Sequence, residues 1–175
     1  MVLTVNVEER PLSEIPANAL PFLDYWRSIA PEGAIAPAWH DFDMLRVPAE
    51  YLPTAVVVDF NPSQHNYHYR YWGSGLTGIF QGDFTGKTFD DLPPPFSYIS
   101  YQTYDPVVQR KRPCLIHFNI SDGATETSFQ DALRVPLSDD GIDVSGVISI
   151  IVQLYRKHEM DQLVESQMSE ILAES

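Results

Sequence analysis

The sequence has 175 residues, a length that suits one domain with a hydrophobic core and leaves little room for two. Hydrophobic residues make up 44% of it and aromatic residues 12%, which separates the chain from disordered acidic proteins. Because 24 acidic residues outweigh 11 basic ones, the formal net charge of −13 argues against binding to nucleic acid or to anionic lipid.

The cellular compartment is indicated by features that the sequence lacks. Its single cysteine, Cys114, allows no internal disulfide and fits a reducing compartment. Residues 1–11 carry Glu8 and Glu9 and lack the basic start and apolar run of a secretory signal. No stretch approaches the roughly 18 apolar residues that span a bilayer. A cytoplasmic location without a membrane span is therefore expected.

The chain is predicted to open with a lead, a helix and a connector. Residues 1–19 show no period and are interrupted by Pro11 and Pro16, so a loosely structured lead is expected. Residues 20–30 place apolar side chains at three-to-four spacing, which predicts a helix. A connector punctuated by prolines follows over residues 34–53.

A hairpin is predicted next. Residues 55–60 and 66–72 are β-branched or aromatic runs separated by turn residues, so they are expected to pair. A short helix follows over residues 76–81. The glycines of residues 82–87 favour a tight turn, because this segment lacks the spacing of a phosphate-binding loop.

A longer helix is predicted over residues 96–112. Asp105 as N-cap and Pro106 as first helical residue predict a kink or a restart within it. The basic residues 110–112 lie where this helix should end, where they complement the helix dipole; a phosphate site is the alternative.

Three strands complete the predicted core, over residues 114–120, 126–137 and 144–155. The first alternates apolar and polar residues, as expected for a half-buried strand. The last is apolar on both faces, so it should lie in the middle of the sheet with both faces covered.

The chain is predicted to end in an amphipathic helix within residues 156–175, with one apolar stripe and an acidic outer face. The order of elements predicts an α+β domain with helices grouped on one face of an antiparallel sheet.

Short motifs in this order resemble the PAS domain, and more narrowly the short PAS family of bacterial proteins. They are LDYWR at 23–27, DFD at 41–43, LP at 52–53, YRYWGS at 69–74, DFTGK at 83–87, RP at 112–113 and VPLSDDG at 135–141. The resemblance covers residues 20–155 and implies a five-stranded antiparallel sheet whose helices enclose a pocket. It also implies a module that senses a small ligand or binds other proteins, and no enzyme.

The same resemblance disfavours the common cofactors of this family, and no cofactor is identified. Haem-binding members resemble one another in a histidine on the long helix, and residues 95–112 contain none. Flavin-binding light-oxygen-voltage members carry an Asn-Cys-Arg-Phe-Leu motif, which is absent here.

Candidate ligand-binding residues cluster on the second predicted strand. Strand alternation puts Tyr69 and Tyr71 on one side and His68, Arg70 and Trp72 on the other, and either side can line the pocket. Arg70 and Trp72 are the preferred pair, because an arginine beside an aromatic ring can engage a carboxylate or stack on a planar ligand. A surface salt bridge of Arg70 is the alternative.

Metal binding and nucleophilic catalysis are both disfavoured. His40, Asp41 and Asp43 come nearest to a metal cluster, but the three or four ligands of zinc are not evident. Cys114 and His117 lie three residues apart on a strand, so they point to opposite faces and cannot form a dyad.

A homodimer is predicted from the last strand, since something must cover its second apolar face. We expect Trp26, Val147 and Ile151 at the interface, with covering by the chain's own leading helix as the alternative.

Together these features predict a non-enzymatic sensory or regulatory module that binds a small ligand, a partner protein or both. Because the chain has no room for an output domain, the signal is expected to leave through association with a partner that carries the output. Two alternatives are an interaction adaptor with a filled core, and a cone-shaped α+β barrel enzyme. The enzyme would need a buried Asp-His or Tyr-Asp pair in its pocket.

Overall fold

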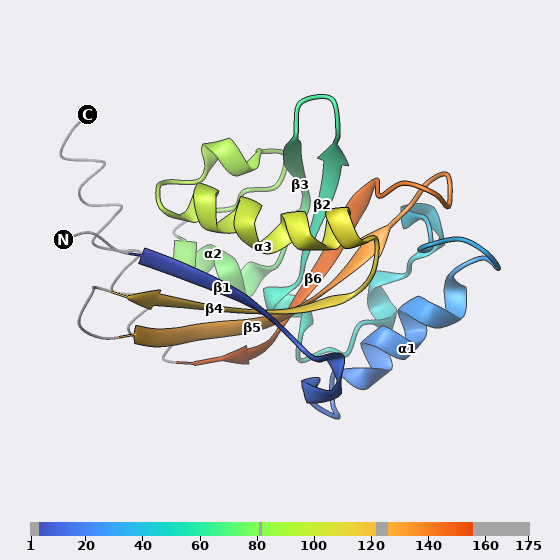
Figure 1. Ribbon diagram of the computed structural model, residues 1–175, viewed down its shortest axis with the longest axis horizontal. Helices are drawn as coiled ribbons and strands as arrows, with labels where there is room; N and C mark the ends of the chain where they lie inside the picture. The colour runs from blue at the N-terminus through green and yellow to red at the C-terminus, as the bar shows by residue number, and fades with distance from the viewer. Residues whose placement is uncertain (1–3, 81, 122–125, 156–175) are drawn as a thin grey trace.

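The computed structural model describes residues 4–80, 82–121 and 126–155, and it is an α+β protein with one antiparallel sheet (Figure 1). The sheet has six strands in the order β1-β4-β5-β6-β2-β3. The strands are β1 (Thr4–Arg10), β2 (Val56–Asn61), β3 (Asn66–Trp72), β4 (Cys114–Ser121), β5 (Glu126–Leu137) and β6 (Gly146–Leu154). The helices are α1 (Leu20–Ile29), α2 (Ser74–Phe80) and α3 (Phe96–Arg110), with short 3-10 turns between the longer elements.

The predicted strands are confirmed at nearly their expected bounds, and β4, β5 and β6 are neighbouring antiparallel strands as the sequence indicated. Strand β6 lies between β5 and β2, in the middle of the sheet. The predicted C-terminal helix within 156–175 lies outside the described residues.

A sixth strand, β1, corrects the prediction of five strands and of a loose lead. It pairs with β4 from Thr4 opposite Ser121 to Arg10 opposite Leu115. The β1 segment is short and rich in charged residues, so its own sequence does not favour a strand. Hydrogen bonding to the open edge of β4 makes the extended conformation favourable.

Helices cover both faces of the sheet, which corrects the prediction that they group on one. Helix α1 packs beneath β5 and β6, where Trp26 Nε1 donates a 2.8 Å hydrogen bond to the carbonyl oxygen of Pro136. Helices α2 and α3 pack against the opposite face (Figure 1). The alternation of β6 therefore sends Ile148 toward α1 and Val147 toward α3.

The residues expected at a dimer interface are covered by the chain itself. Trp26 is 6% exposed and Val147 is fully buried, while Ile151 packs against the core on the α3 side. The predicted homodimer thereby loses the uncovered face on which it depended, because α2 and α3 cover the side of Val147 and Ile151 while α1 covers the other side.

Helix α3 is continuous, so the predicted restart at Asp105 and Pro106 is wrong. The helix ends at Arg110, and Lys111 follows in the left-handed conformation. The basic residues at this end form ion pairs: Arg110 and Arg112 both contact Glu9 of β1. Packing of α3 on the sheet compensates for the backbone hydrogen bond that proline cannot donate.

Gly73 allows β3 to turn directly into α2. Its N–H donates a 2.9 Å hydrogen bond to the carbonyl oxygen of Ala55, and a Cβ atom there would lie 2.3 Å from the carbonyl oxygen of Pro53. This close approach seats α2 against the turn Leu52–Thr54.

Replacing Gly73 with alanine is therefore expected to lower the free energy of unfolding by about 1 to 3 kcal/mol, measured by urea denaturation. Gly78→Ala is the matched control, because Gly78 is exposed in α2 and its Cβ would meet nothing within 4 Å. The control should raise the free energy of unfolding by about 0.5 to 1 kcal/mol. Equal effects of the two substitutions would contradict this explanation.

Candidate functional site

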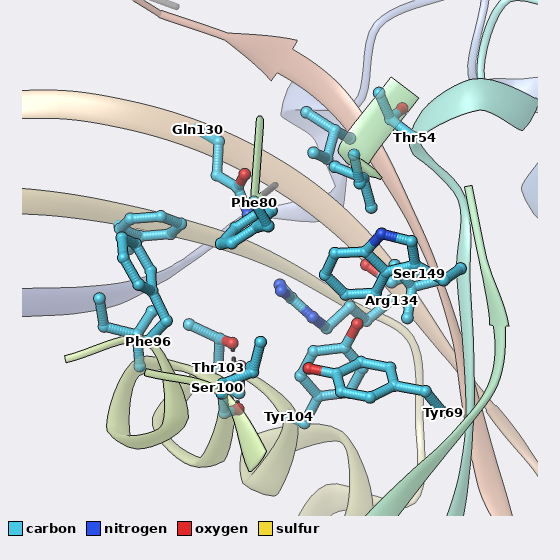
Figure 2. A pocket seen from close by; sticks show the side chains of 17 residues that line it. Thr54, Tyr69, Phe80, Phe96, Ser100, Thr103, Tyr104, Gln130, Arg134 and Ser149 are labelled. Atoms are coloured by element: carbon cyan, nitrogen blue, oxygen red, sulfur yellow. Dashed lines mark hydrogen bonds between the residues drawn. The ribbon is translucent and has the colours of Figure 1, made fainter. Parts of the chain in front are cut away.

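A cavity of about 80 Å³ lies between the sheet and helices α2 and α3 (Figure 2). Most of its walls are apolar or aromatic: Val56, Trp72, Leu76, Phe80, Leu92, Phe96, Ile99, Phe118 and Ile151. Its polar lining consists of Thr54, Tyr69, Ser100, Thr103, Tyr104, Gln130, Arg134 and Ser149. An apolar cavity with a few convergent polar groups is the usual composition of a small-molecule site.

A β-bulge decides which side chains of β3 reach this cavity. Val57 pairs with Tyr71 and Val58 with Tyr69, so Arg70 is the extra residue on β3. The alternation shifts by one position at Arg70. As a result, Tyr69 and Trp72 both face the cavity, with their rings 5.0 Å apart, although simple alternation predicted opposite sides.

Of the five predicted ligand-binding residues, Tyr69 and Trp72 line the cavity and the other three lie elsewhere. Arg70 is exposed on the outer side, where it forms a 2.9 Å ion pair with Asp59. His68 is exposed as well, and Tyr71 packs on the α1 side of the sheet. The bulge turns the side chains of the preferred pair apart, so Trp72 lies on the cavity and Arg70 does not.

Arg134 of β5 is the site residue that sequence reasoning missed. Its side chain extends from the sheet into the space enclosed by the labelled residues of Figure 2, and the residue is 4% exposed. The guanidinium carbon lies 4.3 Å from the ring centroid of Tyr104. The available signal was an arginine between Leu133 and Val135 in the middle of an apolar strand, where charge is rare.

Arg134 also has unfilled hydrogen-bonding capacity. Within the described residues, no acceptor is bonded to its Nε or Nη1 atoms, and the cavity lining contains no carboxylate. Burial lowers the pKa of the Arg134 guanidinium, while contact with Tyr104 acts in the opposite direction. Burial likewise raises the pKa of the Tyr69 phenol well above its usual value, so this phenol stays protonated and neutral.

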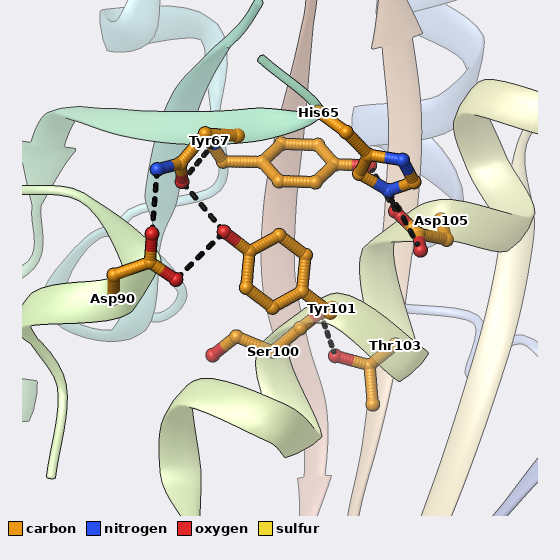
Figure 3. Close-up of polar contacts among 8 residues, drawn as sticks. His65, Tyr67, Asp90, Ser100, Tyr101, Thr103 and Asp105 are labelled. Atoms are coloured by element: carbon orange, nitrogen blue, oxygen red, sulfur yellow. Dashed lines mark hydrogen bonds and ion pairs between the residues drawn. The ribbon is translucent and has the colours of Figure 1, made fainter.

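A polar cluster outside the cavity fixes α3 above the sheet (Figure 3). The Tyr67 hydroxyl donates a 2.7 Å hydrogen bond to Asp105, which also lies 3.0 Å from Nε2 of His65. One turn earlier, the Tyr101 hydroxyl donates a hydrogen bond to Asp90 at 3.0 Å. Burial, and to a lesser extent this hydrogen bond, raises the pKa of Tyr101 to about 12. These contacts position the neighbouring face of α3, which lines the cavity.

A second polar cluster is buried on the opposite face of the sheet. Nδ1 of His117 lies 2.6 Å from Oδ1 of Asp131, and the Tyr155 hydroxyl donates to Oδ2 of Asp131 at 2.7 Å. The neighbours Ile116 and Gln130 face the cavity side, so alternation directs His117 and Asp131 away from it. Neither Asp-containing cluster converges on the cavity.

The remaining candidates have local partners. His40 lies 3.4 Å from Asp41, while Asp43 accepts a hydrogen bond from the Leu45 amide. Across residues 4–80, 82–121 and 126–155, no group of three His, Cys, Asp or Glu side chains is placed to hold a metal ion. Cys114 is buried, and burial raises the pKa of its thiol above the usual value.

No helix among the described residues combines the length and the apolar character that crossing a membrane requires.

Comparison with known proteins gives little. No protein-family model matches the chain, and the curated proteins contain no match. Among solved structures, the chain is similar to an RNA-binding light-oxygen-voltage receptor, with a TM-score of 0.40 and 8% sequence identity. The match covers 99% of this chain and 44% of that chain, so this chain spans less than half the length of the receptor. A likeness at this distance does not indicate what this chain binds.

Proposed function

We propose that this chain is a PAS-type sensory module whose cavity binds a small, partly apolar molecule. The observation that carries the proposal is the cavity itself, with its aromatic walls and one buried cation, Arg134. The motifs over residues 20–155 that resemble the PAS domain support the same reading. Ligand binding would be communicated to a partner protein that carries the output.

The module acts by binding and not by catalysis. Two arrangements with Asp partners support this view by their location: Tyr67 with Asp105 lies outside the cavity lining, and His117 with Asp131 lies on the other face of the sheet. A general acid or base must lie within hydrogen-bonding reach of the reacting group. The net charge of −13 further argues against nucleic acid as a partner.

Ser149→Leu tests whether the cavity is the binding site. Ser149 is 4% exposed and lines the cavity, so leucine would fill part of the space. Native mass spectrometry of freshly purified protein, followed by a thermal-shift screen of small, partly apolar compounds, should detect ligands that bind the wild type and not this variant. Ser28→Leu is the matched control, because Ser28 is exposed on α1 beyond the opposite face.

Two results would contradict the proposal. Ligands that bind wild type and Ser149→Leu equally would place the site elsewhere. A wild-type protein that carries no small molecule and is stabilised by no compound would favour the adaptor alternative instead.

A further inference from the structure

The positive charge of Arg134 is buried, and among the described residues no carboxylate lines the cavity beside it. The guanidinium cannot lose its proton under ordinary conditions, so it remains cationic inside the protein. The stacked ring of Tyr104 stabilises the face of the guanidinium. Its Nε and Nη1 atoms nevertheless have no acceptor in the described part of the chain.

A second buried donor belongs to a residue that lines the same cavity. Nε1 of Trp72 has no hydrogen-bond partner within the described residues, and the Trp72 side chain lines the cavity with Arg134. A buried donor without an acceptor is energetically costly, so native structures rarely keep one without a reason. Two such donors on one cavity call for a ligand that brings acceptors, and the positive charge of one calls for an anion.

The rest of the lining restricts the anion. Arg134 is the one cationic side chain among the described lining residues, so a second carboxylate would be buried without a partner. The net charge of −13 adds long-range repulsion, which grows with the charge of the ligand. The cavity is also walled by Phe80, Phe96 and Ile99, which suit an apolar body.

The volume limits the size of that body. A cavity of roughly 150 Å³ lined by apolar side chains accommodates benzene. The cavity here measures about 80 Å³, roughly half of that volume, so a short aliphatic chain fits it and an aromatic ring does not.

We infer that the cavity binds a monocarboxylate with a short apolar body, its carboxylate accepting hydrogen bonds from Arg134 and its body packed among the aromatic walls. This inference rests on the proposed function and names the ligand class for the same site.

Calorimetric titration of the full chain with matched pairs of probes tests the inference. The pairs are butyrate with butyramide and propionate with propionamide, which differ in charge but hardly in shape. The carboxylates should bind the wild type at least tenfold more tightly than the amides, equivalent to about 1.4 kcal/mol. Arg134→Met should weaken carboxylate binding at least tenfold.

Arg70→Met is the control for removing an arginine, because Arg70 is exposed and outside the cavity lining. This variant should bind butyrate and propionate as the wild type does. Circular dichroism checks that Arg134→Met is folded. If it is not, the comparison of carboxylate with amide on the wild type decides alone.

The outcomes separate the two claims. Amides that bind as tightly as carboxylates, or a folded Arg134→Met that retains carboxylate affinity, would overturn the inference. If Ser149→Leu abolished binding of these probes in that case, the cavity would still be the binding site, and the proposed function would stand without the preference for a carboxylate. Absence of binding by every probe, together with a wild type free of small molecules in native mass spectrometry, would overturn both.

Discussion

Arg134→Met is expected to make the ligand-free protein more stable. The substitution replaces a buried, uncompensated cation by an apolar side chain of similar length. Replacing even a paired set of buried charges by apolar residues is often neutral or stabilising by about 1 to 4 kcal/mol, and an unpaired charge has less attraction to lose. Urea denaturation should show a higher midpoint with an unchanged slope. In a chain of this size, each kcal/mol corresponds to a rise in Tm of roughly 2 to 4 °C.

Arg70→Met separates this effect from the general loss of an arginine. The exposed ion pair of Arg70 with Asp59 contributes little, so its loss should change the free energy of unfolding by less than about 1 kcal/mol. A loss of stability in Arg134→Met greater than about 1 kcal/mol would mean that the folded chain satisfies this arginine. Arg134 would then be a structural residue and not a ligand anchor.

Asp131→Ala is expected to have the largest destabilising effect. Asp131 is 7% exposed and joins three elements: it contacts His117 on β4 at 2.6 Å, accepts from the Tyr155 hydroxyl at 2.7 Å, and lies 3.8 Å from Arg10 on β1. Hydrogen bonds to a charged group contribute about 1.5 to 3 kcal/mol each. We therefore expect a loss of about 3 kcal/mol or more in the free energy of unfolding.

This contribution should depend on pH in a defined direction. The hydrogen bond to Asp131 is the main cause that raises the pKa of Tyr155, so folding favours the protonated phenol. The associated stability is present below the ordinary tyrosine pKa of about 10 and is lost as the pH rises through the raised value. The difference in stability between wild type and Asp131→Ala should accordingly shrink above about pH 10, as urea denaturation in a pH series would measure.

Asp139→Ala is the matched control for the removal of a carboxylate. Asp139 is exposed in the connection between β5 and β6, so its substitution should change the free energy of unfolding by no more than about 0.5 kcal/mol. Equal effects of the two substitutions, or a constant difference across the alkaline range, would contradict the role assigned to Asp131.

Local pattern was sufficient where each element could be recognised from its own residues. The alternation of β4 indicated a strand, although the prediction that it is half-buried is wrong, because both of its faces are buried. The apolar character of β6 indicated both its type and its central place in the sheet. Helix α1 was equally clear, since apolar residues recur on one side of residues 20–29. The sequence pattern did not predict β1, because a short charged segment becomes a strand only when it can pair with the open edge of a neighbouring strand.

The candidate site was less accessible to this reasoning. An interruption of one residue at Arg70 reverses every following side chain, and no residue type marks it in the sequence. Tyr69 and Trp72 were identified as candidates, but the arginine chosen to accompany them was the exposed one. The buried Arg134 lies 64 positions further along the chain, on a strand that was treated only as part of the core.

By itself, the sequence determined that this is an α+β chain with an antiparallel core, because side-chain periodicity reports burial over a few residues at a time. Only the tertiary structure decided that β1 completes the sheet, that α1 closes the second face and that Arg134 is enclosed beside Tyr104 and Trp72. Those features depend on contacts between segments that are distant in the sequence. Whether a buried charge has a partner depends on all of the groups that surround it in space, and no local sequence pattern contains that information.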